Sequence, residues 1–556
     1  MLRRRRSRLV NLTFAALVLL AVFLFLRSRS SRPRYVPSGF DWTQAPVFHP
    51  PGPIKPLPDG EPRPLPSVQA PLSAFTNPSE PDPRRDAVLQ TFKRSYEAYK
   101  TYAWGHDELA PVTRQGRDPS GGYGATLMET LDTLWIMGLK SEFYEAAAFA
   151  AAVDFTKPNA GAVGLFETTV RNLAGLLSAY DLSAEEALLH KATDLGNMLY
   201  IAFDTPNRLP GFWLNWQEAW KGDQKAGTNE ASSLSTSLCL EFTRLSQLTG
   251  DPKYYDATDR ITRFLERMKP QSKLQGMWPT TIDYQNEYVW GDTFSLGAGA
   301  DSLYEYLPKM FALLGGLDPT YETLYRGAAD TASKFLLFRP MLPDGQDILF
   351  AGDARVVSDA IEVHPEFQHL TCFAGGMFGL GGKLFGISEH LDIGERLARG
   401  CAWAYTQFPT GLMPERFTLL PCGSRSGCAW DENRWLQEGN KKLNKGWGYI
   451  RDSRYNLRPE AIESVFLLYR MTGKEEYRDL AWEMWQGIMK STRSDIAHCG
   501  IRDVTESGKP AKSDDMESFW LAATLKYFYL IFSPPDLIHL DEFVFNTRGH
   551  PFRRPV

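Results

Sequence analysis

Hydrophobic residues recur at helical spacing through most of the chain, from about residue 84 onward, in amphipathic stretches separated by short breaks of glycine, proline and aspartate. A hydrophobic period of about 3.6 residues predicts helices rather than strands. One phrase recurs at the breaks: a glycine or Asp/Ser turn, then acidic residues, then an aromatic residue or leucine. Its six instances begin at Met137, Leu182, Leu248, Leu317, Ile387 and Met471.

Each instance has the features of one helix ending and another beginning. Glycine suits the left-handed residue that ends a helix, and acidic residues stabilise the first turn of the next helix. Several instances lie roughly 65 to 85 residues apart, enough for two helices and their loops. Dividing about 470 residues by this unit predicts about seven helical hairpins.

Hairpins of this kind must either stack as a solenoid or close into a ring. A solenoid would have shorter periods and polar terminal caps, whereas this chain ends in an apolar segment at residues 543–545 that is suited to burial. We therefore expect an all-α toroid over residues 84–556, with loops and helix starts at one end of a central cavity. A generic pair of helical bundles is the alternative that periodicity leaves open.

The amino terminus has a different composition. Residues 9–26 form an uncharged run of 18 residues, about the minimum for a membrane-spanning helix. Residues 1–8 form a basic tail, and four arginines also follow the run, so charge favours a cytosolic amino terminus only slightly. We expect a retained signal anchor. Between Pro33 and Pro83 lie 15 of the chain's 37 prolines, which predicts an extended stem over residues 27–83 that holds the large domain away from the membrane.

Composition excludes several classes of function. The formal net charge is −5, and no basic excess indicates nucleic-acid binding. The motifs HExxH, CxxC, GxSxG and the Walker loop are absent from the sequence. Aromatic residues make up 13% of the chain, which is compatible with stacking on sugar rings, although additional core packing explains it more simply.

A few acidic residues are flanked in sequence by apolar residues. Burying an unpaired charge there is costly, so such a residue is expected to have a structural or functional role. They are Glu167, Glu230, Asp301, Glu460, Glu463 and Glu517. Each one alone is explained by a buried cap or a salt bridge. Pro459 places Glu460 and Glu463 in a first helical turn, where the helix dipole favours an ionised base. Glu167 follows Leu165 and Phe166, so we expect desolvation to raise its pKa and make it an acid. Such an opposed pair is what glycoside hydrolysis needs.

Histidine and cysteine give weaker signals. His369 lies among apolar residues, so it is either a satisfied core histidine or a residue that contacts substrate. Six cysteines allow fifteen pairings. Cys422 and Cys428 flank a flexible loop that they could close, Cys239 is expected to be a buried free thiol, and no cysteine has zinc-site spacing.

Six ordered motifs together resemble the class I α-1,2-mannosidases of glycoside hydrolase family 47, over about residues 85–552. They are LDTLWIMGL at 131–139, FETTVR at 166–171, ADSLYEY at 300–306, LRPEAIES at 457–464, MESF at 516–519 and FNT at 545–547. The resemblance implies an (α/α)7 barrel, a calcium ion at its floor, and inverting removal of terminal α-1,2-linked mannose from high-mannose N-glycans.

The resemblance also implies residue roles. Glu167 matches the general acid, acting through a water, Glu460 the base, and Asp301 a third catalytic carboxylate, with the choice of proton donor between Glu167 and Asp301 left open. The implied calcium set is Thr547, Glu463 and Glu517, with oxygen ligands that suit a hard cation. The remaining matches are pocket residues Glu230, His369 and Glu415, the carboxylate partners Arg171 and Arg458, and a disulfide between Cys372 and Cys401 that is similar to that of the processing branch.

Three positions depart from the family pattern. Arg548 and Ala523 stand where the family usually has glutamate, which weakens the expected calcium affinity. Gly299 stands where enzymes of the endoplasmic-reticulum type have arginine, so more room for other glycan branches is expected. This favours trimming of several mannoses in the Golgi, with the endoplasmic reticulum as the alternative location.

We therefore expect a monomeric, single-pass type II membrane enzyme with a lumenal catalytic domain that acts on the high-mannose N-glycans of glycoproteins. The alternative is a membrane-tethered, mannose-binding, lectin-like quality-control factor with weak or lost hydrolysis, suggested by Arg548 and Ala523. A scaffold that binds no glycan would require every buried carboxylate to be structural.

Overall fold

The computed structural model describes residues 32–77, 79, 82–159, 161–358 and 360–555. The predicted tail (1–8) and anchor (9–26) lie outside these ranges, as does the start of the predicted stem. None of the helices in these ranges combines the length and the apolar character that a membrane crossing requires.

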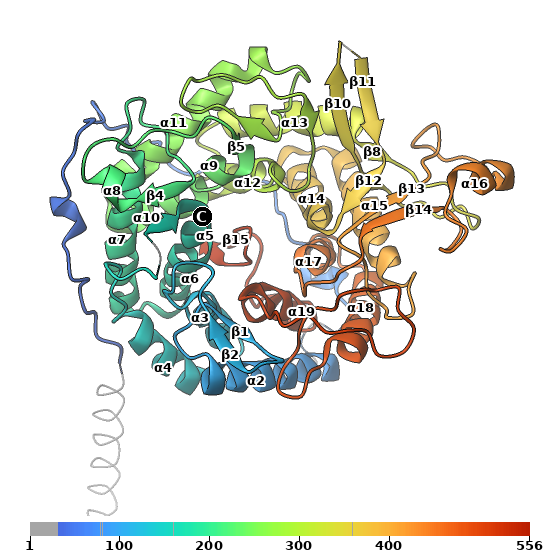
Figure 1. Ribbon diagram of the computed structural model, residues 1–556, viewed down its shortest axis with the longest axis horizontal. Coiled ribbons are helices and arrows are strands. Elements are labelled where there is room, and N and C mark those ends of the chain that lie inside the picture. Colours follow the sequence, from blue (N-terminus) through green and yellow to red (C-terminus); the bar gives the residue numbers. More distant parts are fainter. Residues whose placement is uncertain (1–31, 78, 80–81, 160, 359, 556) are drawn as a thin grey trace, which may run out of the picture.

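Helices form two concentric layers (Figure 1). In the inner layer each helix packs on the next one around the circle, and the last packs on the first through the π-helical segment Trp520–Thr524. The described residues supply seven such helices: α3 (Ala125–Ile136), α6 (Ala174–Ser183), α10 (Cys239–Thr249), α12 (Asp301–Leu313), α14 (Ala374–Phe385), α17 (Glu460–Thr472) and α19 (Leu525–Ile531).

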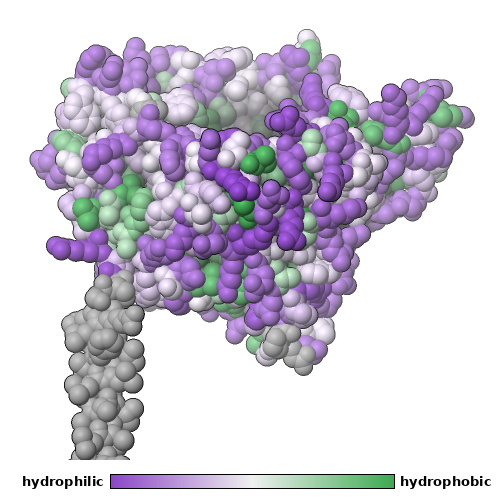
Figure 2. Space-filling model, turned by 60° about the horizontal axis from the view of Figure 1, so that its bottom comes forward, coloured by the Kyte–Doolittle hydropathy of each residue, from purple (hydrophilic) through white to green (hydrophobic). Residues whose placement is uncertain are grey.

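Each inner helix pairs with one outer helix, which gives seven helix pairs in the described part of the chain. Six of the pairs are hairpins of consecutive helices. The outer helices are α2 (Pro83–Tyr102), α4 (Lys140–Ala150), α7 (Glu186–Tyr200), α11 (Lys253–Met268), α13 (Thr320–Phe335), α15 (Ser388–Tyr405) and α18 (Glu476–Thr492). The mostly helical structure therefore fits the expected (α/α)7 barrel. Its surface is mixed, with apolar residues in small separate patches on the face shown in Figure 2.

The recurrent turn phrase marks the hairpins. All six instances fall between an inner helix and the outer helix that follows it. Gly250, at φ 74°, ends α10, and Gly473, at φ 72°, ends α17. Only glycine adopts this left-handed conformation without steric cost, which explains these two turns. The seventh pair joins α2 with α19, from opposite ends of the helical domain.

Short antiparallel strands occupy the loops. The strands are β1 (Glu108–Ala110), β2 (Gln115–Arg117), β3 (Ala162–Gly164), β4 (Trp213–Asn215), β5 (Glu230–Ala231), β6 (Thr281–Ile282), β7 (Thr293–Phe294), β8 (Leu337–Phe338), β9 (Phe350–Ala351), β10 (Asp353–Val357), β11 (Ala360–His364), β12 (Glu366–Gln368), β13 (Arg416–Leu419), β14 (Trp447–Asp452), β15 (Phe543–Phe545) and β16 (Pro551–Arg553). Their sheets are β1-β2, β3-β4, β5-β6, β8-β9, β11-β10-β7, β12-β13-β14 and β15-β16. Short helical turns α5 (Leu165–Glu167), α8 (Trp216–Ala219), α9 (Ser232–Thr236) and α16 (Glu432–Glu438) complete the loops.

The carboxyl-terminal hairpin fills the middle of the ring (Figure 1). All three residues of β15 are buried, and Phe545 packs against Phe466 of α17 and Tyr527 of α19. The expectation that residues 543–545 are buried is therefore confirmed. The turn between β15 and β16 carries Thr547 and Arg548 into the interior of the barrel.

Residues 32–77, here called the strap, lie against the barrel. Their extended backbone fits their proline content, and its amides bond to the helical domain: Phe48 N donates to Asp204 at 2.8 Å, Val68 N to Asp541 at 2.6 Å and Ala70 N to the Arg470 carbonyl at 2.8 Å. Val68 is fully buried. The described part of the predicted stem is thus a brace on the barrel rather than a free spacer.

The strap generates the first prediction. A chain that begins at residue 79 should melt at a lower temperature than a chain that begins at residue 32. Burial of Trp42, Val68 and Phe75 is worth roughly 1.5–3 kcal/mol for each side chain, so the loss of the strap should lower Tm by roughly 5 °C or more. Differential scanning calorimetry of the two chains measures this, and equal melting temperatures would show that the strap does not stabilise the barrel.

Candidate active site

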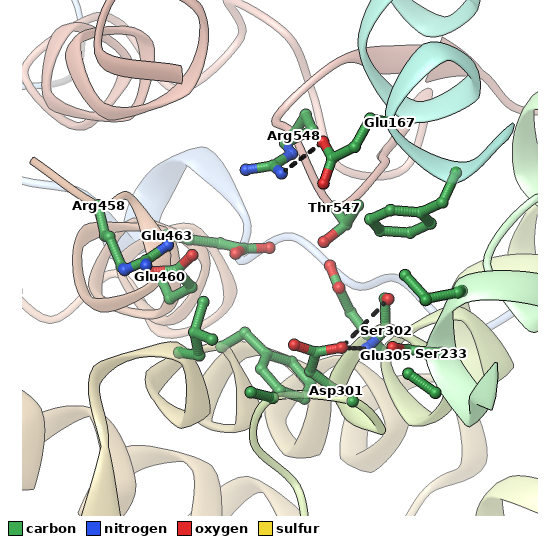
Figure 3. Close-up of a pocket in the computed structure, with 17 residues that line it drawn as sticks. Glu167, Ser233, Asp301, Ser302, Glu305, Arg458, Glu460, Glu463, Thr547 and Arg548 are labelled. Atoms are coloured by element: carbon green, nitrogen blue, oxygen red, sulfur yellow. Dashed lines mark hydrogen bonds and ion pairs between the residues drawn. The ribbon is translucent and has the colours of Figure 1, made fainter. Parts of the chain in front are cut away.

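One cavity of about 250 Å³ lies at the end of the barrel where inner helices begin (Figure 3). Pockets that enclose drug-sized ligands have volumes of roughly 300–1,000 Å³, so this smaller space suits a single sugar ring rather than an oligosaccharide. Its lining comes from segments far apart in sequence. The lining residues are Phe166, Glu167, Ala231, Ser233, Leu234, Ala298, Gly299, Asp301, Ser302, Glu305, Leu370, Phe373, Arg458, Glu460, Glu463, Thr547 and Arg548.

The ends of secondary-structure elements place these side chains. Asp301 is the first residue of α12, Glu460 is the first residue of α17, and Glu167 ends α5 immediately before a π-helical segment, Thr168–Leu173. The amino-terminal ends of α12 and α17 carry partial positive charge toward the cavity, which favours acidic groups there. The predicted gathering of Glu167, Asp301, Glu460 and Thr547 around one pocket is therefore what the structure contains.

Among the three predicted catalytic carboxyl groups, Asp301 is the one that most readily keeps its proton. Burial raises its pKa to about 6, and the nearby charges of Glu305 and Glu460 act in the same direction. Hydrogen bonds from the Ser302 amide, at 2.8 Å, and from the Ser233 hydroxyl oppose the rise only in part. Asp301 can therefore donate a proton near pH 6.

Glu460 has the opposite environment. Burial alone would raise its pKa, but a hydrogen bond from His369, with 3.1 Å between Nδ1 and Oε2, and the charge of Arg458 outweigh burial and lower the pKa below its ordinary value. An ionised carboxylate in a small cavity can accept a proton from water. The prediction of an ionised group at the start of this helix agrees with the structure.

Glu167 differs from the sequence-based expectation of a raised pKa. Burial acts in the expected direction, but the charges of Arg171 and Arg548 outweigh it and lower the pKa of Glu167 to about 2. Arg171 Nε lies 2.6 Å from Glu167 Oε2, and an Arg548 nitrogen lies 3.2 Å from the same oxygen. The apolar neighbours do surround Glu167, but two guanidinium groups keep it ionised.

Residues behind the cavity wall hold the lining in place. Arg171 is buried, bonds to Ser518, and also lies 3.7 Å from Glu517. Arg458 Nε donates to Glu415 at 2.7 Å. The predicted roles of Arg171 and Arg458 as carboxylate partners are thus consistent with these contacts. Of these residues only Arg458 lines the cavity itself.

The three predicted pocket residues Glu230, His369 and Glu415 lie outside the cavity lining. His369 is fully buried behind Glu460, and its other ring nitrogen lies 2.8 Å from the Tyr405 hydroxyl, so it reaches the cavity only through Glu460. His369 does not line the cavity, which favours the alternative of a satisfied core histidine over direct contact with substrate. Glu230, in β5, lies beside Ala231 of the lining, and burial raises its pKa.

Sequence reasoning missed Lys309 and Glu305. Lys309 Nζ bonds to Glu305 and lies 3.2 Å from Glu463 Oε1, in a fully buried cluster. Asp301, Glu305 and Lys309 are spaced four residues apart on α12. This spacing, which places side chains on one helix face, is the signal that would have found both residues.

The cysteines follow the expectations. Cys372 and Cys401 form a disulfide that links the 3-10 turn preceding α14 to α15, and Cys422 and Cys428 close the short loop between them. Cys239 is a buried free thiol, as predicted, and Cys499 is another.

Two carboxyl groups with oppositely shifted pKa values in a sugar-sized cavity are the groups that glycoside hydrolases use. The profile of glycosyl hydrolase family 47 matches residues 91–554. The chain belongs to this family and is a glycoside hydrolase.

Relatives with similar sequences or structures are named as α-1,2-mannosidases. The chain is 34% identical over 479 residues, covering 84% of this chain and 78% of the relative, to mannosyl-oligosaccharide 1,2-alpha-mannosidase MNS1 of Arabidopsis thaliana. It is 36% identical over 488 residues, covering 86% and 69%, to the endoplasmic reticulum mannosyl-oligosaccharide 1,2-alpha-mannosidase of Rattus norvegicus. The solved alpha-1,2-mannosidase of Trichoderma reesei is similar with a TM-score of 0.77 and 31% identity, covering 85% of this chain and all of that one.

The contact between His369 and Glu460 generates a prediction for enzyme activity. In His369→Leu, Glu460 loses a charge-stabilising hydrogen bond, which is worth roughly 1.5–3 kcal/mol, so the acid limb of the pH profile of kcat/KM should move upward by roughly one pH unit or more. In the matched variant Tyr405→Phe, the direct contact remains, and a smaller shift is expected. An unchanged acid limb in His369→Leu would mean that His369 does not control Glu460.

Proposed function

We propose that this chain removes terminal α-1,2-linked mannose from the high-mannose N-glycans of glycoproteins, by an inverting mechanism. The observation that carries the proposal is the pair Asp301 and Glu460, which share one sugar-sized cavity and have oppositely shifted pKa values. Membership of glycosyl hydrolase family 47 and the names of the relatives support the choice of bond and sugar.

The chemistry follows from the two protonation states. Glu460 takes a proton from a water molecule. The oxygen of that water attacks the anomeric carbon of the terminal mannose. Asp301 gives its proton to the glycosidic oxygen as the bond between that oxygen and the anomeric carbon breaks. The products are free mannose and a glycan shorter by one residue. We assign the donor role to Asp301 rather than Glu167, because two arginines keep Glu167 ionised.

Glu167 has a different role in this mechanism. A transition state with positive charge on the sugar ring is stabilised by a fixed negative charge placed in advance. Glu167 lines the cavity and is held by Arg171 and Arg548, so its carboxylate does not need to reorganise during the reaction. It can also order a water molecule beside Asp301.

The calcium ion implied by the family resemblance remains a prediction, and the residues present fit it poorly. Thr547 and Glu463 line the cavity and offer oxygen atoms, but Glu463 is paired with Lys309. Arg548 adds a positive charge next to Thr547. In the described ranges no cluster of three or more acidic, histidine or cysteine side chains is placed to hold a metal. No step of the mechanism is therefore derived through an ion.

Anchoring and location are part of the proposal. The apolar run at residues 9–26 supports a membrane anchor with the barrel in the lumen of the secretory pathway. Gly299 lines the cavity at φ 92°, and a Cβ there would lie 3.5 Å from the nearest heavy atom of the groups around it. The lack of a side chain at this lining position supports trimming of several mannoses and a Golgi location, with the endoplasmic reticulum as the alternative.

A second candidate function is a mannose-binding, lectin-like factor without efficient turnover. The observation that favours it is Arg548, which lies against a pocket carboxylate, beside Thr547. The next variant separates the two candidates.

Glu460→Gln should abolish turnover and preserve binding. The change removes the base but keeps the size of the side chain, so kcat should fall roughly 10²- to 10⁴-fold with little change in melting temperature. Release of mannose from a high-mannose glycan measures kcat. The control Glu389→Gln changes an exposed glutamate on α15 and should have wild-type kcat. A wild-type chain that binds the glycan and releases no mannose would support the lectin-like function instead.

The pH profile tests the assignment of the donor. Because Asp301 must carry a proton, kcat/KM should be highest below pH about 6 and should fall about tenfold per pH unit above it. Glu460 must be ionised, so activity should persist down to below the ordinary glutamate pKa. Rates of mannose release between roughly pH 4 and pH 9 measure the upper limit and show whether activity persists at the acid end. A profile that stays flat through pH 6 to 8 would contradict a donor role for Asp301.

A further inference from the structure

The chain itself supplies cations to most of the carboxylates around the cavity. Lys309 contacts both Glu305 and Glu463, and Arg171 bonds to Glu167. Arg458 lies close enough to Glu460 to lower the pKa of that carboxyl group. The negative charge that would attract a divalent ion is therefore already largely offset by positive groups from the protein.

Among the described residues, Arg548 is one of the two arginines that line the cavity itself. It follows Thr547 in the turn between β15 and β16, in the middle of the ring, and its side chain is 14% exposed. Its guanidinium faces Glu167 across the cavity lining (Figure 3) and packs 5.5 Å from the centre of the Phe519 ring. The ion pair and the aromatic contact fix its position.

Most hydrogen-bond donors of Arg548 remain available to a ligand. A guanidinium has five N–H groups. Within the part of the chain that the structure describes, the guanidinium of Arg548 donates one hydrogen bond to protein, to Glu167. Because Arg548 lines the cavity, its other N–H groups can donate to neighbouring hydroxyl groups of a sugar ring.

The same position is unfavourable for a metal ion. Ca²⁺ takes six to eight oxygen ligands, and acidic side chains set its affinity. Thr547 contributes oxygen atoms here, but its neighbour Arg548 contributes a permanent positive charge, because arginine stays protonated in proteins. A divalent ion beside Thr547 would be repelled by a cation that cannot move without losing its contact with Glu167.

We propose that Arg548 is the resident cation of the cavity: its guanidinium, fixed between Glu167 and Phe519, binds hydroxyl groups of the terminal sugar, and turnover requires no bound divalent ion. This inference rests on the proposed function, which it deepens. Arg548 thereby becomes a substrate-binding residue rather than an obstacle to catalysis, and the departure from the family pattern at this position becomes a change of mechanism.

Calcium titration of the full chain tests the metal half of the proposal. Isothermal titration with CaCl₂, up to roughly 1 mM, should give no saturable binding, because sensor-type sites that are built for calcium bind well below that concentration. Mannose release from an α-1,2-linked mannobiose should change less than twofold when EDTA replaces calcium. Saturable calcium binding, or a larger loss that calcium restores, would overturn the proposal.

Two variants of Arg548 test the sugar-binding half. In Arg548→Gln, kcat/KM should fall at least tenfold, with most of the change in KM, and calcium should not restore it. In Arg548→Glu, the charge beside Thr547 changes by two units, so saturable calcium binding should appear and the remaining activity should become sensitive to EDTA. A fall of less than tenfold in Arg548→Gln, or no calcium binding by Arg548→Glu, would contradict the proposal.

A matched control and a second readout keep the test decisive. Arg553→Gln changes an exposed arginine in β16 and should have wild-type kinetics. If Arg548→Gln does not fold, the wild-type titration and the EDTA assay decide alone. If the full chain releases no mannose under any condition, the proposed function fails, whereas calcium titration and mannobiose binding, measured by calorimetry, still decide the role of Arg548.

Discussion

The active site depends on the pairing of its carboxylates with arginine and lysine side chains. An ionised carboxylate in a cavity costs several kcal/mol unless a cation or hydrogen bonds compensate it. Here the compensation comes from other inner elements: Lys309 on α12 reaches Glu463 on α17, and Arg171 reaches Glu517 just before the π-helical segment that leads into α19. These contacts between helices gather like charges without leaving them unpaired.

The distribution of cations also sets the chemical roles. Glu167 has two arginines, whereas Asp301 contacts only neutral hydrogen-bond donors and faces the charges of two glutamates. The proton therefore stays on Asp301. Two carboxyl groups of the same chemical type become a donor and a fixed charge because of what lies next to each one.

Much of the fold could be predicted from the sequence, because hairpin turns are local features. The six turn phrases lie where six hairpins reverse direction. The seventh pair of helices is not a hairpin and has no such signal, since α2 and α19 come from opposite ends of the domain and no turn connects them. The strap was predicted as extended chain, but proline content fixes backbone conformation and does not indicate that Asp204 and Asp541 would accept hydrogen bonds from its amides.

The sequence predicts which residues form the site better than it predicts their pKa values. Ordered motifs identified the carboxylates, and the spacing on α12 contained the signal for Lys309. The pKa of Glu167 was expected to rise because only its neighbours in sequence were considered, whereas the second cation that lowers it is 381 residues away. Likewise, His369 lies 91 residues from Glu460, and no local pattern indicates which of the two faces the cavity. Tertiary contacts decide both.

The carboxyl-terminal hairpin links the fold to the chemistry. Thr547 and Arg548 reach the cavity only because β15 is buried inside the ring, so the active site is complete only after the last part of the chain has packed against α17 and α19. Because Arg171 also contacts Glu167, that carboxylate would remain paired without Arg548. Arg548 adds to the effect of Arg171 on the pKa of Glu167. Within the described residues the guanidinium of Arg548 donates a single hydrogen bond to protein, so Arg548 adds further hydrogen-bond donors to the cavity lining. This is the physical reason to assign Arg548 to substrate rather than to structure.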